Sequence, residues 1–107
     1  MKTFLFVFLV TPNKQNPDYT TIKEGIATVW VRENNSEKAK TLAQKHVSEG
    51  YWDITAIQRD AQETTLSHYH DRPEGEICYL KSQIHGISSF VAATGVSNPH
   101  GINPPSN

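Results

Sequence analysis

The chain begins with an apolar run, TFLFVFLV (residues 3–10), in which both alternating sets of positions are aromatic or branched. Successive side chains of a strand point to opposite faces, so this pattern predicts a central strand that is covered on both faces. The segment 11–24 contains two prolines and several polar turn-forming residues, which predicts a loop. Alternation returns in GIATVWVR (25–32), the second predicted strand.

The segment 34–50 has the spacing of a helix with one buried stripe. Its apolar positions and one histidine recur at intervals of three and four residues: Ala39, Leu42, Ala43, His46 and Val47. One of Asn34, Asn35 and Ser36 is expected to cap the start of this helix. Gly50 is expected to end it in the left-handed conformation.

Two further strands are predicted in the second half of the chain. Alternation of apolar and polar residues resumes over 51–58, and the run ISSFVAATG (87–95) predicts the last strand. Between them, the segment 59–70 is ambiguous: its polar first half is typical of a turn, and its second half alternates like a short edge strand.

A second helix is predicted over 71–86. Its apolar residues are spaced by three and four positions: Ile77, Leu80 and Ile84. Asp71 and Glu74 have the spacing of a capping box, and Pro73 suits a first helical turn. Gly86 is expected to end the helix.

The predicted order is therefore ββαβαβ, which indicates an α+β protein. We expect a two-layer sandwich, ferredoxin-like in general architecture, with a four-stranded sheet and both helices on one face. Residues 1–96 are expected to form a single domain. Residues 97–107 contain three prolines and no periodicity, which predicts a flexible C-terminal tail.

If both helices lie on one face, the other face of the sheet is open and apolar. Large exposed apolar patches are typical of interaction surfaces, so we expect a homodimer or a protein partner on that face. The predicted interface residues are the aromatic side chains of the first two strands: Phe4, Phe6, Phe8 and Trp30. The alternative is that the loop 11–24 or the tail folds over this face.

Charge and cysteine content narrow the function classes. The net charge is −1, and no run of lysine or arginine is present, so we expect no nucleic-acid partner. The start of the chain resembles a short secretory signal, but no small-residue cleavage site follows it, and the apolar run is too short to cross a membrane. A single cysteine, Cys78, excludes an internal disulfide and favours a cytoplasmic protein.

The stretch SHYHDRPEGE (67–76) is the strongest candidate for chemistry. Residues two apart share one side of an extended segment, so His68 and His70 could bind a metal ion with Glu74 as a third ligand. Such a metal site would indicate a metal-binding protein or a small metal-assisted hydrolase. Cys78 could act as a nucleophile with one of these histidines as base, but its place in an amphipathic helix favours a small buried residue.

No motif identifies a reaction, so the sequence favours a non-enzymatic protein without a cofactor that acts through protein–protein interaction. A further alternative is a cofactor-free enzyme or small-ligand-binding module, of the kind that dimeric α+β sandwiches provide. That alternative predicts a pocket between the sheet and the helices, with Tyr51, Asp53 and His85 around it.

Overall fold

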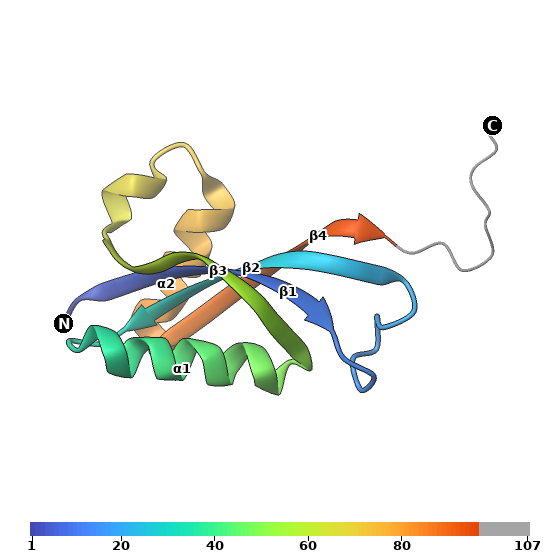
Figure 1. Ribbon diagram of the computed structural model, residues 1–107. Coiled ribbons are helices and arrows are strands. Elements are labelled where there is room, and N and C mark those ends of the chain that lie inside the picture. Colours follow the sequence, from blue (N-terminus) through green and yellow to red (C-terminus); the bar gives the residue numbers. More distant parts are fainter. Residues whose placement is uncertain (97–107) are drawn as a thin grey trace.

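The computed structural model describes residues 1–96, and it confirms the order ββαβαβ. Seven elements follow one another along the chain (Figure 1): β1 (Thr3–Pro12), β2 (Ile22–Arg32), α1 (Ser36–Glu49), β3 (Trp52–Thr64), the 3₁₀ helix η1 (Leu66–Tyr69), α2 (Pro73–His85) and β4 (Ile87–Val96). The predicted flexible tail, 97–107, lies outside the described residues.

The four strands form one sheet in the order β3-β1-β2-β4. Every neighbouring pair is antiparallel, so β2 and β3 run in the same direction with β1 between them. β1 is central, as its apolar residues on both faces predict. The protein is thus an α+β domain with a four-stranded antiparallel sheet and two helices.

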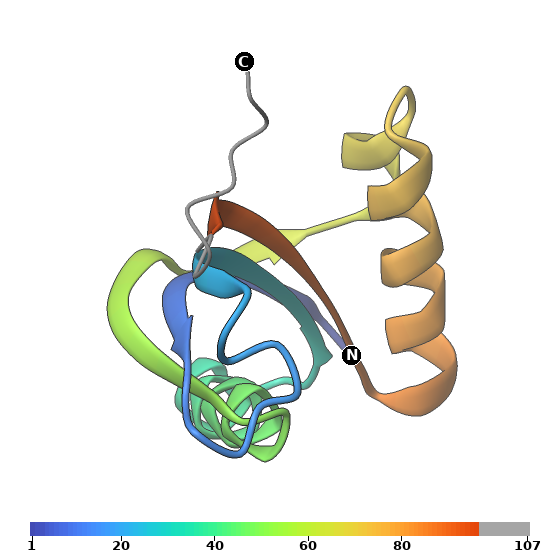
Figure 2. The ribbon, with the colours of Figure 1, turned by 90° about the vertical axis from the view of Figure 1, so that its right-hand side faces the viewer.

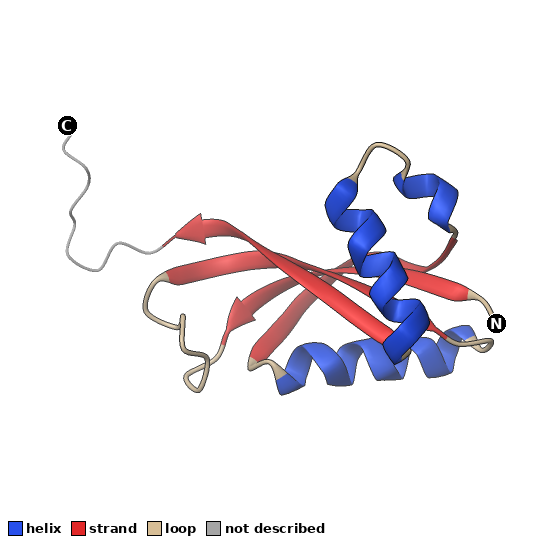
Figure 3. Ribbon diagram, turned by 180° about the vertical axis from the view of Figure 1, so that it is seen from behind, coloured by secondary structure: helices blue, strands red, loops and turns tan. Residues whose placement is uncertain are grey.

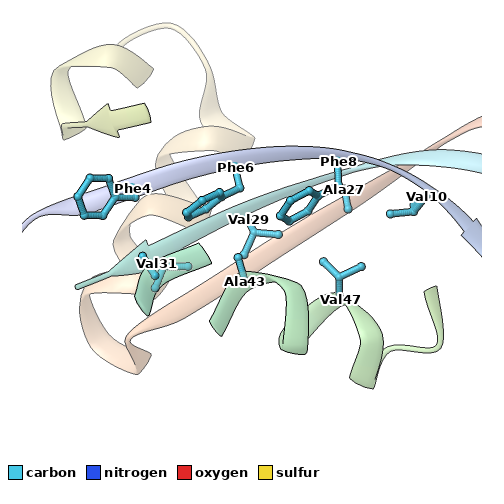
Figure 4. Packing of buried hydrophobic residues seen from close by; sticks show 10 residues of the cluster. Phe4, Phe6, Phe8, Val10, Ala27, Val29, Val31, Ala43 and Val47 are labelled. Atoms are coloured by element: carbon cyan, nitrogen blue, oxygen red, sulfur yellow. The ribbon is translucent and has the colours of Figure 1, made fainter. Parts of the chain in front are cut away.

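One face of the sheet packs against α1 and forms the main core (Figure 4). Phe6 lies opposite Val29 and Phe8 opposite Ala27 in the β1–β2 ladder, so their side chains share this face. The stripe of α1 that covers them consists of small residues: Ala39, Ala43 and Val47. Small side chains allow the helix to approach the sheet closely, and both phenylalanines are 0% exposed.

The second helix covers the other face of the sheet, so the prediction of both helices on one face is wrong. Neighbouring residues of β4 show this directly, because Ser88 donates a hydrogen bond to the carbonyl of Cys78 in α2, whereas Ser89 contacts His46 in α1. Successive strand residues point to opposite faces. The two helices accordingly lie on opposite sides of the sheet (Figure 2), and the ferredoxin-like arrangement is not confirmed.

The third strand continues six residues beyond its predicted end, to Thr64. The ambiguous segment 59–70 is therefore partly strand and partly the helix η1. β3 is an edge strand with mostly exposed side chains, so its apolar alternation stops although its pairing with β1 continues. Three register shifts interrupt this pairing, and in the bulge between Gln62 and Arg59 the residue Ala61 has a positive φ of 45°.

The helix ends agree only in part with prediction. Asn35 caps α1, since its side chain accepts a hydrogen bond from the Lys38 amide. The left-handed residue after α1 is Tyr51, with φ of 64°, and not Gly50. The capping box of Asp71 and Glu74 is also wrong, because α2 begins one residue later than that spacing requires, after Arg72.

The loop between β1 and β2 turns toward the end of α1 and does not cover the second face. Asn16 is buried and donates hydrogen bonds through Nδ2 to the carbonyls of Gly50 and Tyr51. Its Oδ1 accepts a bond from the amide of Asp18. These bonds hold the loop against the turn between α1 and β3.

Candidate functional site

A cleft of about 610 Å³ lies on the second face of the sheet, between the strands and the η1–α2 segment. This segment rises above the sheet on the side away from α1 (Figure 1). All four strands contribute to the cleft, and η1 and the first turn of α2 close one side of it. Small-molecule sites commonly have such a volume and such a mixture of apolar and polar walls.

Residues paired across the strands form the floor of the cleft. Arg59, Val7, Thr28 and Phe90 lie side by side on β3, β1, β2 and β4. In the next row, Leu5 pairs with Trp30 on one side and with Gln62 on the other. The centre of the floor is therefore apolar, and its edge on β3 is polar.

The bulge around Ala61 in β3 determines which polar groups reach this floor. Leu5 and Val7 are two residues apart in β1, whereas their partners Gln62 and Arg59 are three residues apart in β3. Residues three apart in a regular strand point to opposite faces, so the bulge is what allows both partners to lie on one face. Both line the cleft, where Arg59 Nη1 donates to Gln62 Oε1 at 2.8 Å.

A chain of hydrogen bonds joins the floor of the cleft to η1. The indole N–H of Trp30 donates to Tyr69 Oη at 2.9 Å, and this hydroxyl bonds Thr64 Oγ1 at 2.8 Å. Thr64 Oγ1 in turn bonds His68 Nδ1 at 2.9 Å. The backbone N–H of Thr65 also points at this Nδ1, so the nitrogen accepts; Thr64 therefore donates to His68, and Tyr69 donates to Thr64.

The same nitrogen of His68 also accepts the backbone N–H of Thr65, at 3.3 Å. Nδ1 is therefore the unprotonated nitrogen of the ring, and the neutral side chain carries its hydrogen on Nε2. His68 lines the cleft, so this N–H is a donor that the hydrogen-bond chain does not use.

The histidine pair does not form the predicted metal site. His68 and His70 lie on and just after the 3₁₀ helix η1, where residues two apart point to different sides. His68 and Glu74 line the cleft, but His70 is exposed beside Asp71. Within residues 1–96, no group of three or more His, Cys, Asp and Glu side chains could hold a metal ion.

The four predicted interface residues are buried inside the protein. Phe4, Phe6 and Phe8 lie in the core under α1, and Trp30 is 4% exposed beneath Tyr69. Their burial follows from the placement of one helix on each face. The exposed apolar side chains are therefore those of other residues.

An exposed apolar surface lies instead on α2. Its three large aliphatic side chains, the stripe that predicts the helix, are exposed to solvent: Ile77 (52% exposed), Leu80 (45%) and Ile84 (77%). The opposite side of α2, which crosses the sheet in Figure 3, buries Ser82. We call Ile77, Leu80 and Ile84 the α2 stripe.

Polar contacts attach α2 to the sheet. Gln83 Nε2 donates to Thr3 Oγ1 at 2.7 Å and to Ser82 Oγ at 3.2 Å. Ser88 of β4 donates to the carbonyl of Cys78. These bonds satisfy the side chains between helix and sheet, so α2 keeps its position although its aliphatic residues face outward.

Cys78 lies on α2 outside the residues that line the cleft. Burial raises the pKa of its thiol; Lys81 opposes this rise and Glu74 adds to it. A raised pKa keeps the thiol protonated near neutral pH, where only the thiolate is a strong nucleophile. The surroundings of Cys78 therefore do not favour nucleophilic catalysis.

The polar groups of the cleft differ from those predicted for a pocket. Tyr51, Asp53 and His85 do not line it. Arg59 and Arg72 were missed as site residues, since Arg59 lies in the segment that was ambiguous and Arg72 next to a predicted cap. The SHYH stretch did mark part of the site, through His68 and Tyr69.

The described residues contain no helix that is long and apolar enough to cross a membrane. Comparison with known proteins found no matching family model, no matching curated protein and no matching solved structure. Two features on the second side of the sheet are candidates for a functional role: the cleft and the α2 stripe.

Proposed function

We propose that this protein acts by binding another protein chain through the outer side of α2 and the neighbouring edge strand β4, and that the partner is a second copy of itself. The α2 stripe carries the proposal, with all three side chains at least 45% exposed. Amphipathic helices usually turn such a stripe toward a core. Contiguous exposed apolar side chains are typical of interaction surfaces.

The composition of β4 favours a second copy of the chain as the partner. This edge strand has ten residues, none of them charged and none a proline. Edge strands usually carry such residues, because their unpaired N–H and C=O groups otherwise pair with another strand. Two β4 strands can pair in antiparallel orientation about a twofold axis perpendicular to the sheet, which would bring both α2 helices to the same side.

The proposed role is non-enzymatic and cytoplasmic. The raised pKa of Cys78 gives no support to a thiol nucleophile. The single cysteine, which leaves no disulfide within the chain, is compatible with the proposed location.

Sedimentation equilibrium tests the proposal on the full chain. The wild type is expected to have twice the 12.0 kDa mass of one chain. Leu80→Glu should dissociate the dimer, because a charge buried in an apolar interface lacks a partner. Leu42→Glu is the matched control: Leu42 is 40% exposed, close to the 45% of Leu80, but lies on α1.

Two results would overturn the proposal. One is a wild type that keeps the mass of a single chain at every concentration. The other is an equal loss of dimer in Leu42→Glu and Leu80→Glu, which would mean that the α2 stripe has no special part. Circular dichroism of both variants verifies that each one is folded.

A further inference from the structure

We propose that the cleft between the sheet and the η1–α2 segment binds a small organic acid, namely a carboxylate attached to a flat apolar body. Its volume of about 610 Å³ lies within the usual range for small-molecule sites. The residues of the α2 stripe do not line the cleft. Among the described residues that line the cleft, Phe90 alone lies on β4, so ligand binding here does not require the proposed dimer.

The floor of the cleft suits the apolar part of such a ligand. Leu5 and Val7 are partly exposed there, and Phe90 is 43% exposed. The floor is also held rigidly, because Trp30 is buried and its indole N–H is bonded to Tyr69. A flat ring laid on these side chains would remove their exposed apolar area from water.

The charged groups of the cleft suit one carboxylate. Arg59 and Arg72 line it, and neither takes part in the ion pairs found among residues 1–96. Arg59 uses one donor on Gln62, whereas a guanidinium has five, so donors remain for a bidentate contact. Among the described residues that line the cleft, Glu74 is the one acidic side chain, so their fixed charges sum to +1 and match a monoanion.

His68 adds a neutral donor to these charges. Its Nδ1 accepts bonds from Thr64 and Thr65, which leaves the hydrogen of the neutral ring on Nε2. An N–H donor and two guanidinium groups around an apolar floor form the usual composition of a site that orients a small anion.

The test is an NMR titration of the ¹⁵N-labelled full chain with two probes, naphthalene-2-carboxylate and naphthalene-2-carboxamide. They share one flat apolar body and differ in charge. The carboxylate should shift the indole N–H signal of Trp30 and the amides of η1 saturably, with a dissociation constant of about 1 mM or below. The carboxamide should bind more weakly.

Variants separate charge recognition from apolar binding. Arg59→Gln should weaken carboxylate binding about tenfold, the loss of one charged hydrogen-bonding group, and leave carboxamide binding unchanged. Arg59→Lys should recover part of the loss. Lys38→Gln is the matched control, because Lys38 is exposed on α1 and its substitution removes the same charge far from the cleft.

Three results would overturn the inference. The first is the absence of saturable shifts around the cleft with the carboxylate. The second is equal affinity of wild type for carboxylate and carboxamide. The third is a set of shifts confined to α2 beyond its first turn, which would mean that the probe binds the α2 stripe instead.

Discussion

The two faces of the sheet are covered by helices of similar length that pack in opposite ways. α1 turns its small apolar residues inward onto Phe6 and Phe8. α2 turns Ser82 inward and exposes Leu80 and Ile84. Helical spacing identifies an apolar stripe in both segments, but it does not determine what that stripe faces.

Adjacent residues of β4 illustrate this difference on a small scale. Ile87 packs at the core on the α1 face, whereas the next residue, Ser88, bonds the α2 backbone on the other face. One face is thus held mainly by apolar burial, and the other by specific hydrogen bonds. The cleft that Arg59 and His68 line and the α2 stripe both lie on the second side.

The largest expected effect comes from emptying the core on the α1 face. Phe6→Ala should lower the free energy of unfolding by about 3–5 kcal/mol, since it opens a cavity in a close-packed region. Phe90→Ala on the second face is the matched comparison and should cost about 1 kcal/mol, because Phe90 is already 43% exposed. Urea denaturation measures both, and equal losses would contradict the proposed contrast between the faces.

A smaller effect is expected from the hydrogen-bond chain on the second face. Tyr69→Phe should lower the free energy of unfolding by about 1–3 kcal/mol, because the buried indole N–H of Trp30 loses its acceptor. Tyr79→Phe is the control, since no hydrogen bond of the Tyr79 hydroxyl is found in the described part of the chain; it should change stability by about 0.5 kcal/mol or less. If Tyr79→Phe costs as much as Tyr69→Phe, the hydrogen-bond chain does not stabilise this face.

The two helix starts provide a third comparison. Asn35→Ala should cost about 1 kcal/mol, because the Asn35 side chain accepts the amide hydrogen of Lys38 at 2.9 Å. Asp71→Ala should change stability by about 0.5 kcal/mol or less, since α2 has no side-chain cap. Thermal unfolding followed by circular dichroism measures both losses of stability. A larger loss for Asp71→Ala than for Asn35→Ala would support the predicted capping box.

The smallest effect concerns the ionisation of Cys78. Because burial raises the pKa of this thiol, it should react with an aromatic disulfide reagent more slowly in the folded protein than in urea near neutral pH. The protonated thiol is favoured by folding, so this contribution to stability is present at lower pH and is lost as pH rises through the raised pKa. If Cys78 reacts as fast in the folded protein as in urea, its thiol does not have a raised pKa in the folded state.

Much of the element order could be predicted from the sequence, because periodicity reports local geometry directly. The side of the sheet on which each helix lies could not be predicted, since the contacts of Thr3 with Gln83 and of Ser88 with Cys78 depend on tertiary placement. The length of β3 was underestimated for a related reason. An edge strand pairs through its backbone and does not need alternating apolar side chains.

The site was predictable only through the SHYH stretch. His68 and Tyr69 do line the cleft, but as parts of a hydrogen-bond chain and not as metal ligands. Arg59 reaches the cleft because of the bulge around Ala61, a non-glycine residue at positive φ. Bulges of this kind have no reliable sequence signal, although they often redirect side chains near functional sites.

The most direct test of the central claim, that the α2 stripe is the contact between two copies, is chemical crosslinking at that stripe. Two chains that both carry Cys78→Ser would be treated with a short bis-maleimide. One also carries Ile84→Cys, and the control carries Leu42→Cys. We predict a covalent species of twice 12.0 kDa on a denaturing gel for Ile84→Cys and very little for Leu42→Cys. No covalent dimer from Ile84→Cys, or equal yields from both chains, would contradict the claim.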